Sequence, residues 1–105
     1  MIGKVEFSSG DLEEVIRLFQ DLIRIDTTNP PGNESKAAEY LKTQFDSSGI
    51  DCEVLGEPGR ENVIAKIGGQ RDKPRLLFES HTDVVPAAGV GTWTHPPFSA
   101  EIEDQ

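Results

Sequence analysis

Two residues at the end of an apolar run have the types and spacing of a metal ligand and its orienting partner. The stretch from Phe78 to Pro86 reads FESHTDVVP, with His81 and Asp83 two positions apart. Imidazole is a common metal ligand, and its second ring nitrogen needs an acceptor that fixes the tautomer and the ring orientation. In an extended backbone residues i and i+2 point to the same side, so the Asp83 carboxylate can reach the His81 ring. The pattern indicates a ligand and its orienter.

A structural interpretation of the same residues stays open. A histidine at a strand end can bond a local backbone group, and a single His-x-Asp occurs by chance in many proteins. Glu79 is either an acidic neighbour of the site or a solvated strand residue. His95, the other histidine, precedes two prolines that stiffen its loop. Only Glu101 stands near it as an acidic orienter, which favours a structural role for His95.

Helical patterns precede this stretch. The segment from Asp11 to about Ile25 predicts an amphipathic helix capped by Ser8 or Ser9, because apolar residues recur at three- and four-residue spacing: Leu12, Val15, Ile16, Phe19, Leu22 and Ile23. The run from Asp26 to Asn33 contains two prolines and a glycine, which end the helix and predict a rigid connector, with the wall of a pocket as the alternative. A second helix is predicted from Glu34 to Ser47, with Asn33 as N-cap, Gly49 as its stop, and an inner face of Ala37, Ala38, Leu41 and Phe45.

Strand patterns follow the helices. Residues 50–55 and 62–67 alternate between apolar and polar, and the loop between them contains Gly and Pro, so the two strands are predicted to pair antiparallel. Residues 75–78, RLLF, do not alternate, which predicts a strand covered on both faces, as in the interior of an α/β sheet. The chain is therefore assigned to the α/β class. In open α/β sheets ligands gather at the carboxyl ends of strands, where His81 would lie.

Composition excludes several functional classes. The 105 residues include 19 acidic and 10 basic side chains, for a net charge of −9, with no basic patch to neutralise phosphates. We therefore expect no nucleic-acid partner. Apolar stretches are too short to span a bilayer, and the N-terminus has no signal-peptide pattern, so we expect a cytoplasmic protein without membrane contact. Cys52, the only cysteine, is predicted to pack in a strand.

Three motifs in order resemble one enzyme family. IRIDTTNPPGNE, RLLFESHTDVVPA and TWTHPPFSAEIED together resemble the N-terminal portion of M20 metallopeptidases, which include aminoacylases, acetylornithine deacetylase, succinyl-diaminopimelate desuccinylase and glutamate carboxypeptidases. The resemblance covers nearly the whole chain. It implies that residues 1–105 are the N-terminal segment of a zinc-peptidase-like catalytic domain, with a mixed sheet flanked by helices, and that this domain is truncated here. The lid or dimerisation domain of full-length members would be absent.

The resemblance also implies roles for individual residues. His81 matches the first zinc ligand, and Asp83 matches the catalytic-site aspartate that clamps its imidazole. The complete site is expected to hold two zinc ions, with cobalt as an alternative. Its bridging aspartate, Glu-Glu pair, further acidic ligand and distal histidine have no match in this sequence, and Gln105 stands where the family usually has Gly.

The activity implied is metal-assisted amide hydrolysis in N-acyl amino acids or small peptides, by an enzyme that forms homodimers in some full-length members. A zinc-activated water, a glutamate base and stabilisation of the oxyanion would carry the reaction. The isolated chain, with one credible ligand, is expected to be inactive and marginally folded or self-associating. The alternative is a non-catalytic remnant or interaction module.

Overall fold

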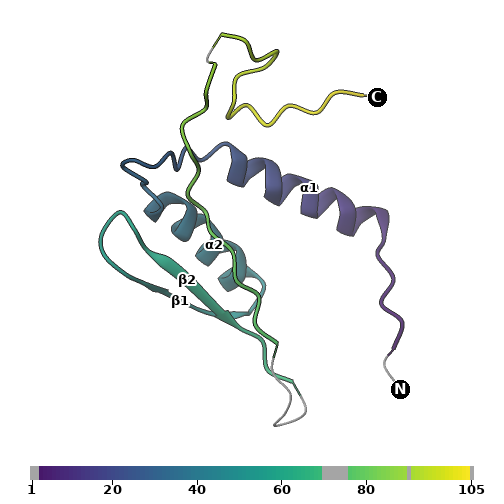
Figure 1. Ribbon diagram of the computed structural model, residues 1–105. Helices are drawn as coiled ribbons and strands as arrows, with labels where there is room; N and C mark the ends of the chain where they lie inside the picture. Colours follow the sequence, from purple (N-terminus) through teal and green to yellow (C-terminus); the bar gives the residue numbers. More distant parts are fainter. Residues whose placement is uncertain (1–2, 70–75, 90, 105) are drawn as a thin grey trace. The chain divides into compact units, whose positions relative to one another are not determined.

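The computed structural model describes residues 3–69, 76–89 and 91–104, which divide into two compact units. The first contains residues 3–25 together with the C-terminal segment from Gly89, and the second contains Asp26–Ala88. The elements are α1 (Ser9–Ile23), α2 (Ser35–Ser47), β1 (Asp51–Leu55) and β2 (Asn62–Lys66), shown in Figure 1. The α/β class is confirmed at this level.

Helix α1 is the main element of the first unit, and a capping box defines its start. The Ser8 side chain accepts a hydrogen bond from the Asp11 amide, while the Asp11 carboxylate accepts one from the Ser8 amide. This confirms one of the two predicted caps and moves the helix start from the predicted Asp11 to Ser9. Near its other end, the Gln20 side chain donates to the carbonyl of Ala100 at 2.7 Å, which ties the C-terminal segment to the helix.

The second unit is built from α2 and an antiparallel hairpin. Strands β1 and β2 pair in the register Cys52↔Ala65 and Val54↔Val63, which confirms the predicted antiparallel pair. Helix α2 contacts both strands and lies along the hairpin in Figure 1. The small core sits between them, with Ala37, Ala38 and Cys52 buried. This confirms the predicted packing role of Cys52. It also confirms Ala37 and Ala38 of the predicted inner face of α2, whereas Leu41 and Phe45 are half-buried.

The start of α2 differs from the prediction. Asn33 does not cap the helix, because its φ of 60° places it in the left-handed region rather than in the extended conformation of a cap. Glu34 occupies the N-cap position without a side-chain cap. The hairpin loop fastens this end instead: the Glu34 amide donates to the Gly59 carbonyl, and the Gly59 amide donates to the Ser35 hydroxyl. At the other end Gly49, at φ 69°, ends the helix as predicted.

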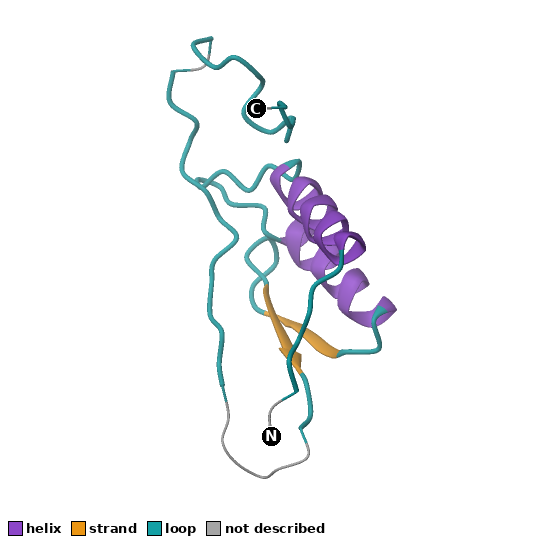
Figure 2. Cartoon of the chain, turned by 90° about the vertical axis from the view of Figure 1, so that its right-hand side faces the viewer, coloured by secondary structure: helices purple, strands orange, loops and turns teal. Residues whose placement is uncertain are grey.

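The predicted doubly covered strand is the main disagreement with the sequence analysis. Arg75 lies outside the described residues, and Leu76, Leu77 and Phe78 form extended chain without a strand partner, drawn as a loop in Figure 2. Their exposed fractions are 79%, 83% and 87%. The prediction of a covered strand here is wrong for this structure, because a strand needs a neighbour on its hydrogen-bonding edge and the described residues provide none. The two-stranded hairpin is the sheet observed, and a larger mixed sheet stays a prediction.

Candidate metal-ligand site

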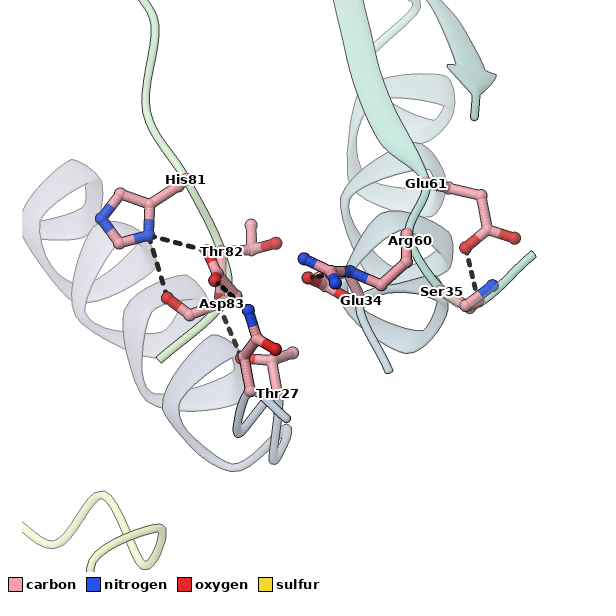
Figure 3. A network of polar contacts seen from close by, with 10 residues as sticks. Thr27, Glu34, Ser35, Arg60, Glu61, His81, Thr82 and Asp83 are labelled. Carbon is pink, nitrogen blue, oxygen red and sulfur yellow. Dashed lines mark hydrogen bonds and ion pairs between the residues drawn. The ribbon is translucent and has the colours of Figure 1, made fainter. Parts of the chain in front are cut away.

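His81 and Asp83 make the contact that their spacing predicts. The His81 Nδ1 atom lies 3.1 Å from Asp83 Oδ1 and 2.9 Å from the Asp83 main-chain oxygen. Both partners are acceptors, so Nδ1 is the donor in this contact, and Nε2 is the ring nitrogen on the side away from Asp83. In Figure 3 the ring turns its Nδ1 edge toward Asp83. The contact is confirmed, while the roles of ligand and orienter stay predictions.

The surroundings of His81 differ from those expected at the end of a buried strand. The His81 side chain is 84% exposed, whereas that of Asp83 is 33% exposed. The hydrogen bond from the Asn29 side chain is the largest of the influences that hold the pKa of Asp83 below its ordinary value. Partial burial of the carboxyl opposes this shift, and the His81 hydrogen bond adds to it. The lowered pKa favours the carboxylate form of Asp83, which accepts the hydrogen bond from His81 Nδ1.

The connector from Asp26 to Asn33 supports this site through contacts that no local sequence pattern indicates. Thr28 and Val84 form a parallel bridge, in which the Asn29 amide donates to the Val84 carbonyl at 2.8 Å and the Val84 amide to the Thr27 carbonyl at 3.2 Å. The buried Thr27 hydroxyl, 4% exposed as a residue, donates to the Thr82 carbonyl at 2.6 Å. The side-chain Nδ2 of Asn29 donates to Asp83 Oδ2 at 3.0 Å.

Local chemistry explains how the connector reaches that position. Asp26 Oδ1 accepts hydrogen bonds from the Thr28 amide and hydroxyl, which forms an Asx turn directly after α1. The Thr28 hydroxyl is the main cause of the lowered pKa of Asp26. The hydrogen-bonding side chains of Thr27 and Asn29 were a signal in the sequence, but their partners lie 55 and 54 residues away and only the fold identifies them.

A cavity of about 420 Å³ adjoins His81 and Asp83 within the second unit. Its other polar lining comes from Glu34, Arg60, Glu61 and Glu79. Figure 3 shows the Glu34–Arg60 pair and the His81–Asp83 pair as two separate groups, and all four residues line the cavity. Arg60 Nε donates to Glu34 Oε1 at 2.8 Å, and the Ser35 hydroxyl donates to Glu61, which lowers the pKa of Glu61. Glu79 is exposed and lines the cavity, which is compatible with both roles considered for it from the sequence.

His95 is held by acidic side chains in the first unit. Its Nδ1 lies 2.8 Å from Glu101 Oε2, and its Nε2 lies 2.5 Å from Glu103 Oε1. Glu101 was the acidic neighbour noted from the sequence, and Glu103 was not recognised. Both ring nitrogens face carboxylates, so neither lone pair is presented to a metal ion. This arrangement agrees with the structural interpretation of His95.

The donor set fits one metal ligand rather than a complete centre. His81 is exposed and Asp83 holds its Nδ1, as outer partners of metal-bound histidines do. Among residues 3–69, 76–89 and 91–104 no group of three or more His, Cys, Asp or Glu side chains could hold a metal ion together. The geometry of the pair therefore fits the predicted ligand and orienter, and a catalytic zinc would need further ligands. Within the same described residues, neither helix is long and apolar enough to cross a bilayer.

Comparison with known proteins gives one consistent result. The chain is 39% identical over 94 residues to a succinyl-diaminopimelate desuccinylase of Hydrogenovibrio crunogenus, a match that covers 88% of this chain and 23% of the relative. It is 39% identical over 94 residues to that of Methylorubrum extorquens, with 85% and 23% covered. A probable succinyl-diaminopimelate desuccinylase of Staphylococcus aureus is 38% identical over 87 residues, with 82% and 21% covered. No family model matches the chain. The chain spans about a fifth to a quarter of the length of these relatives.

Proposed function

Because this chain is a homologue of a segment of the succinyl-diaminopimelate desuccinylases, which are M20-family proteins, we propose that its protein is a metal-dependent amidohydrolase. The proposed reaction is hydrolysis of the amide bond of an N-acyl amino acid or a small peptide. The relatives are named for removal of a succinyl group, which favours a deacylase over a carboxypeptidase. The corresponding substrate is an N-acylated amino acid with an acidic acyl group.

The observation that carries this proposal is the contact between His81 and Asp83. Nδ1 donates to two acceptors from Asp83 and the side chain is exposed, so Nε2 is the ring nitrogen available to a metal ion. In the neutral ring of this tautomer, Nε2 carries the lone pair that binds a metal ion. His81 is the proposed ligand and Asp83 the proposed orienter. A zinc ion, when bound, supplies Lewis-acid chemistry toward the amide carbonyl.

The residues of this chain would contribute positioning rather than proton transfer to the substrate. Asp83 keeps the ring in one tautomer and limits its rotation, which raises the basicity of Nε2 toward the metal. The cavity beside the pair, with its surplus of carboxylates over cationic groups, offers room next to the ligand. The remaining metal ligands and the general base would come from residues other than those described here.

Replacement of each histidine in turn tests the ligand assignment. In the purified protein that carries this chain, we expect His81→Ala to lower zinc affinity and the kcat/KM for N-succinyl-diaminopimelate by at least about 100-fold. Removal of a residue that only hydrogen-bonds a metal ligand typically costs about 10- to 100-fold in metal affinity or activity. Removal of the ligand itself should therefore cost at least the upper end of that range. His95→Ala is the matched control, because the chain has two histidines and His95 presents no lone pair to a metal. Zinc content is measured by metal analysis and hydrolysis by the loss of amide absorbance.

The two readouts separate the parts of the proposal. If His81→Ala retains wild-type zinc affinity, His81 is not a ligand and the proposal loses its main support. If the wild-type protein binds zinc through His81 but hydrolyses neither N-acyl amino acids nor small peptides, the metal site stands and the amidohydrolase assignment is wrong.

A further inference from the structure

The two carboxylate oxygens of Asp83 have different partners. Oδ1 accepts the hydrogen bond from His81 Nδ1 at 3.1 Å, and Oδ2 accepts the one from the Asn29 side-chain amide at 3.0 Å. The three side chains thus form a short series in which Asn29 donates to Asp83 and His81 donates to the same carboxylate. A carboxylate attached through a single rotatable bond can present either oxygen to a neighbour, unless a second partner selects one of them.

Asn29 is placed for this contact by main-chain hydrogen bonds that do not depend on its side chain. The parallel bridge between Thr28 and Val84 sets the register of the two segments, and the Asn29 amide donates to the Val84 carbonyl. The buried Thr27 hydroxyl anchors the preceding residue to Thr82. A change of the Asn29 side chain would therefore leave the backbone pairing intact while removing the contact with Asp83.

The chemistry of the asparagine side chain suits this position. Its NH₂ group donates to a carboxylate, and as a neutral group it brings no charge that would compete for a nearby cation. A lysine would form a stronger bond to Asp83, but its positive charge would stand close to the proposed metal. An aspartate of nearly the same shape would have no proton to donate and would repel the Asp83 carboxylate.

We propose that Asn29 is a positioning residue: it fixes the orientation of the Asp83 carboxylate and, through it, the ring orientation of His81. The carboxylate also favours the Nδ1–H tautomer, together with the Asp83 main-chain oxygen. This inference rests on the proposed function, because it concerns the affinity of the same metal ligand. It adds to the site a residue that lies 54 positions before Asp83 in the sequence. The connector after α1 thereby acts as the outer support of the ligand.

Two variants of Asn29 test the proposal in the full protein. Asn29→Ala removes the donor, and Asn29→Asp keeps the shape while replacing the donor with an acceptor. We expect both to weaken zinc binding by about 3- to 30-fold, somewhat less than the 10- to 100-fold typical of direct outer partners. Affinity is measured by competition with a zinc chelator. The matched control is Asn33→Gly, because Asn33 is exposed in the same connector and its left-handed backbone suits glycine.

A second readout separates positioning from a merely structural role. In zinc-free protein labelled with ¹⁵N-histidine, the His81 signal is identified as the one lost in His81→Ala. At a pH where the ring is neutral, wild type should show protonated Nδ1 and unprotonated Nε2, and both Asn29 variants should shift toward the Nε2–H tautomer. The isosteric Asn29→Asp keeps the test valid if Asn29→Ala does not fold.

The outcomes distinguish this inference from the function it rests on. Unchanged zinc affinity and an unchanged tautomer in the Asn29 variants, together with loss of zinc in His81→Ala, would overturn the role of Asn29 and leave the ligand assignment intact. Unchanged zinc affinity in His81→Ala would overturn the ligand assignment itself. Weaker binding in both Asn29 variants, with Asn33→Gly unaffected, would support the positioning role.

Discussion

Asp83 shows how one side chain links local and distant parts of the chain. Its contact with His81 spans two residues and follows from extended geometry, whereas its contact with Asn29 spans 54. The distant contact is also the main cause of the lowered pKa of Asp83. The lowered pKa of the carboxylate that faces His81 therefore comes mainly from a residue that no local pattern connects with it.

Gly32 gives a second test at the scale of single residues. Its φ of 107° favours glycine, and an added Cβ would collide with Glu34 Oε2 and lie 3.0 Å from Arg60 Nε. Glu34 is buried and paired with Arg60, so it has little room to move. We expect Gly32→Ala to lower the free energy of unfolding by about 1–3 kcal/mol, the range for a strained backbone position.

Urea denaturation of the full protein measures this loss. Gly68→Ala is the matched control, because nothing lies within 4 Å of an added Cβ there and its φ is not in the left-handed region. A Gly32→Ala variant as stable as Gly68→Ala would show that the Glu34–Arg60 pair can rearrange without cost.

At the scale of elements, the capping box makes the start of α1 dependent on pH. Hydrogen bonds from the Ser8 side chain and amide lower the pKa of Asp11 from its ordinary value of 3.8. A carboxyl whose pKa is lowered by folding stabilises the folded state above its unfolded pKa, and this contribution is lost as the pH falls through the folded pKa. We expect the first turn of α1 to keep its protection against amide hydrogen exchange at pH 5–7 and to fray below about pH 3.8. In Asp11→Asn this protection should depend less on pH.

Removal of the Ser8 side chain measures how much the cap stabilises the first turn of α1. Ser8→Ala should cost about 1 kcal/mol, which corresponds to roughly fivefold faster amide hydrogen exchange in the first turn of α1 at pH 7. The reference is exchange in α2, which has no side-chain cap and should not change. Equal exchange rates in Ser8→Ala and wild type would mean that the capping box does not limit opening of this helix end.

At the scale of the whole molecule, the exposed apolar run is the dominant feature. Leu76, Leu77 and Phe78 are each more than three-quarters exposed, and contiguous exposed apolar residues mark surfaces that another element or another chain covers. We expect the 105-residue chain expressed alone to self-associate or to unfold without a sharp transition. Sedimentation velocity and thermal unfolding measure this, and a monodisperse monomer with a cooperative transition would contradict it.

A pair of double variants locates the cause of association. Leu77→Lys/Phe78→Lys should reduce the association of the isolated chain, because it places two charges in the apolar run. Val5→Lys/Phe7→Lys changes the net charge equally at two residues that are also exposed, 77% and 79%, but separated by polar neighbours. This control should reduce the association of the isolated chain less than Leu77→Lys/Phe78→Lys does. An equal effect of the two double variants would mean that net charge, rather than the run at 76–78, governs association.

The sequence by itself determined the features that depend on near neighbours. These are the two helices, the Ser8 cap, the Gly49 stop, the antiparallel hairpin and the His81–Asp83 contact, because period, capping chemistry and i, i+2 geometry are local. The three motifs also pointed to the family that the relatives share.

Only the tertiary structure decided what holds these local features together. It showed that Asn33 does not cap α2, that residues 76–78 lack a strand partner, and that the connector carrying Thr27 and Asn29 pairs with residues 82–84. Each of these depends on which segments distant in the sequence meet, and side-chain types alone do not specify that pairing. The supported state of Asp83 is therefore a property of the fold, because its main partner reaches it only when the two segments lie side by side.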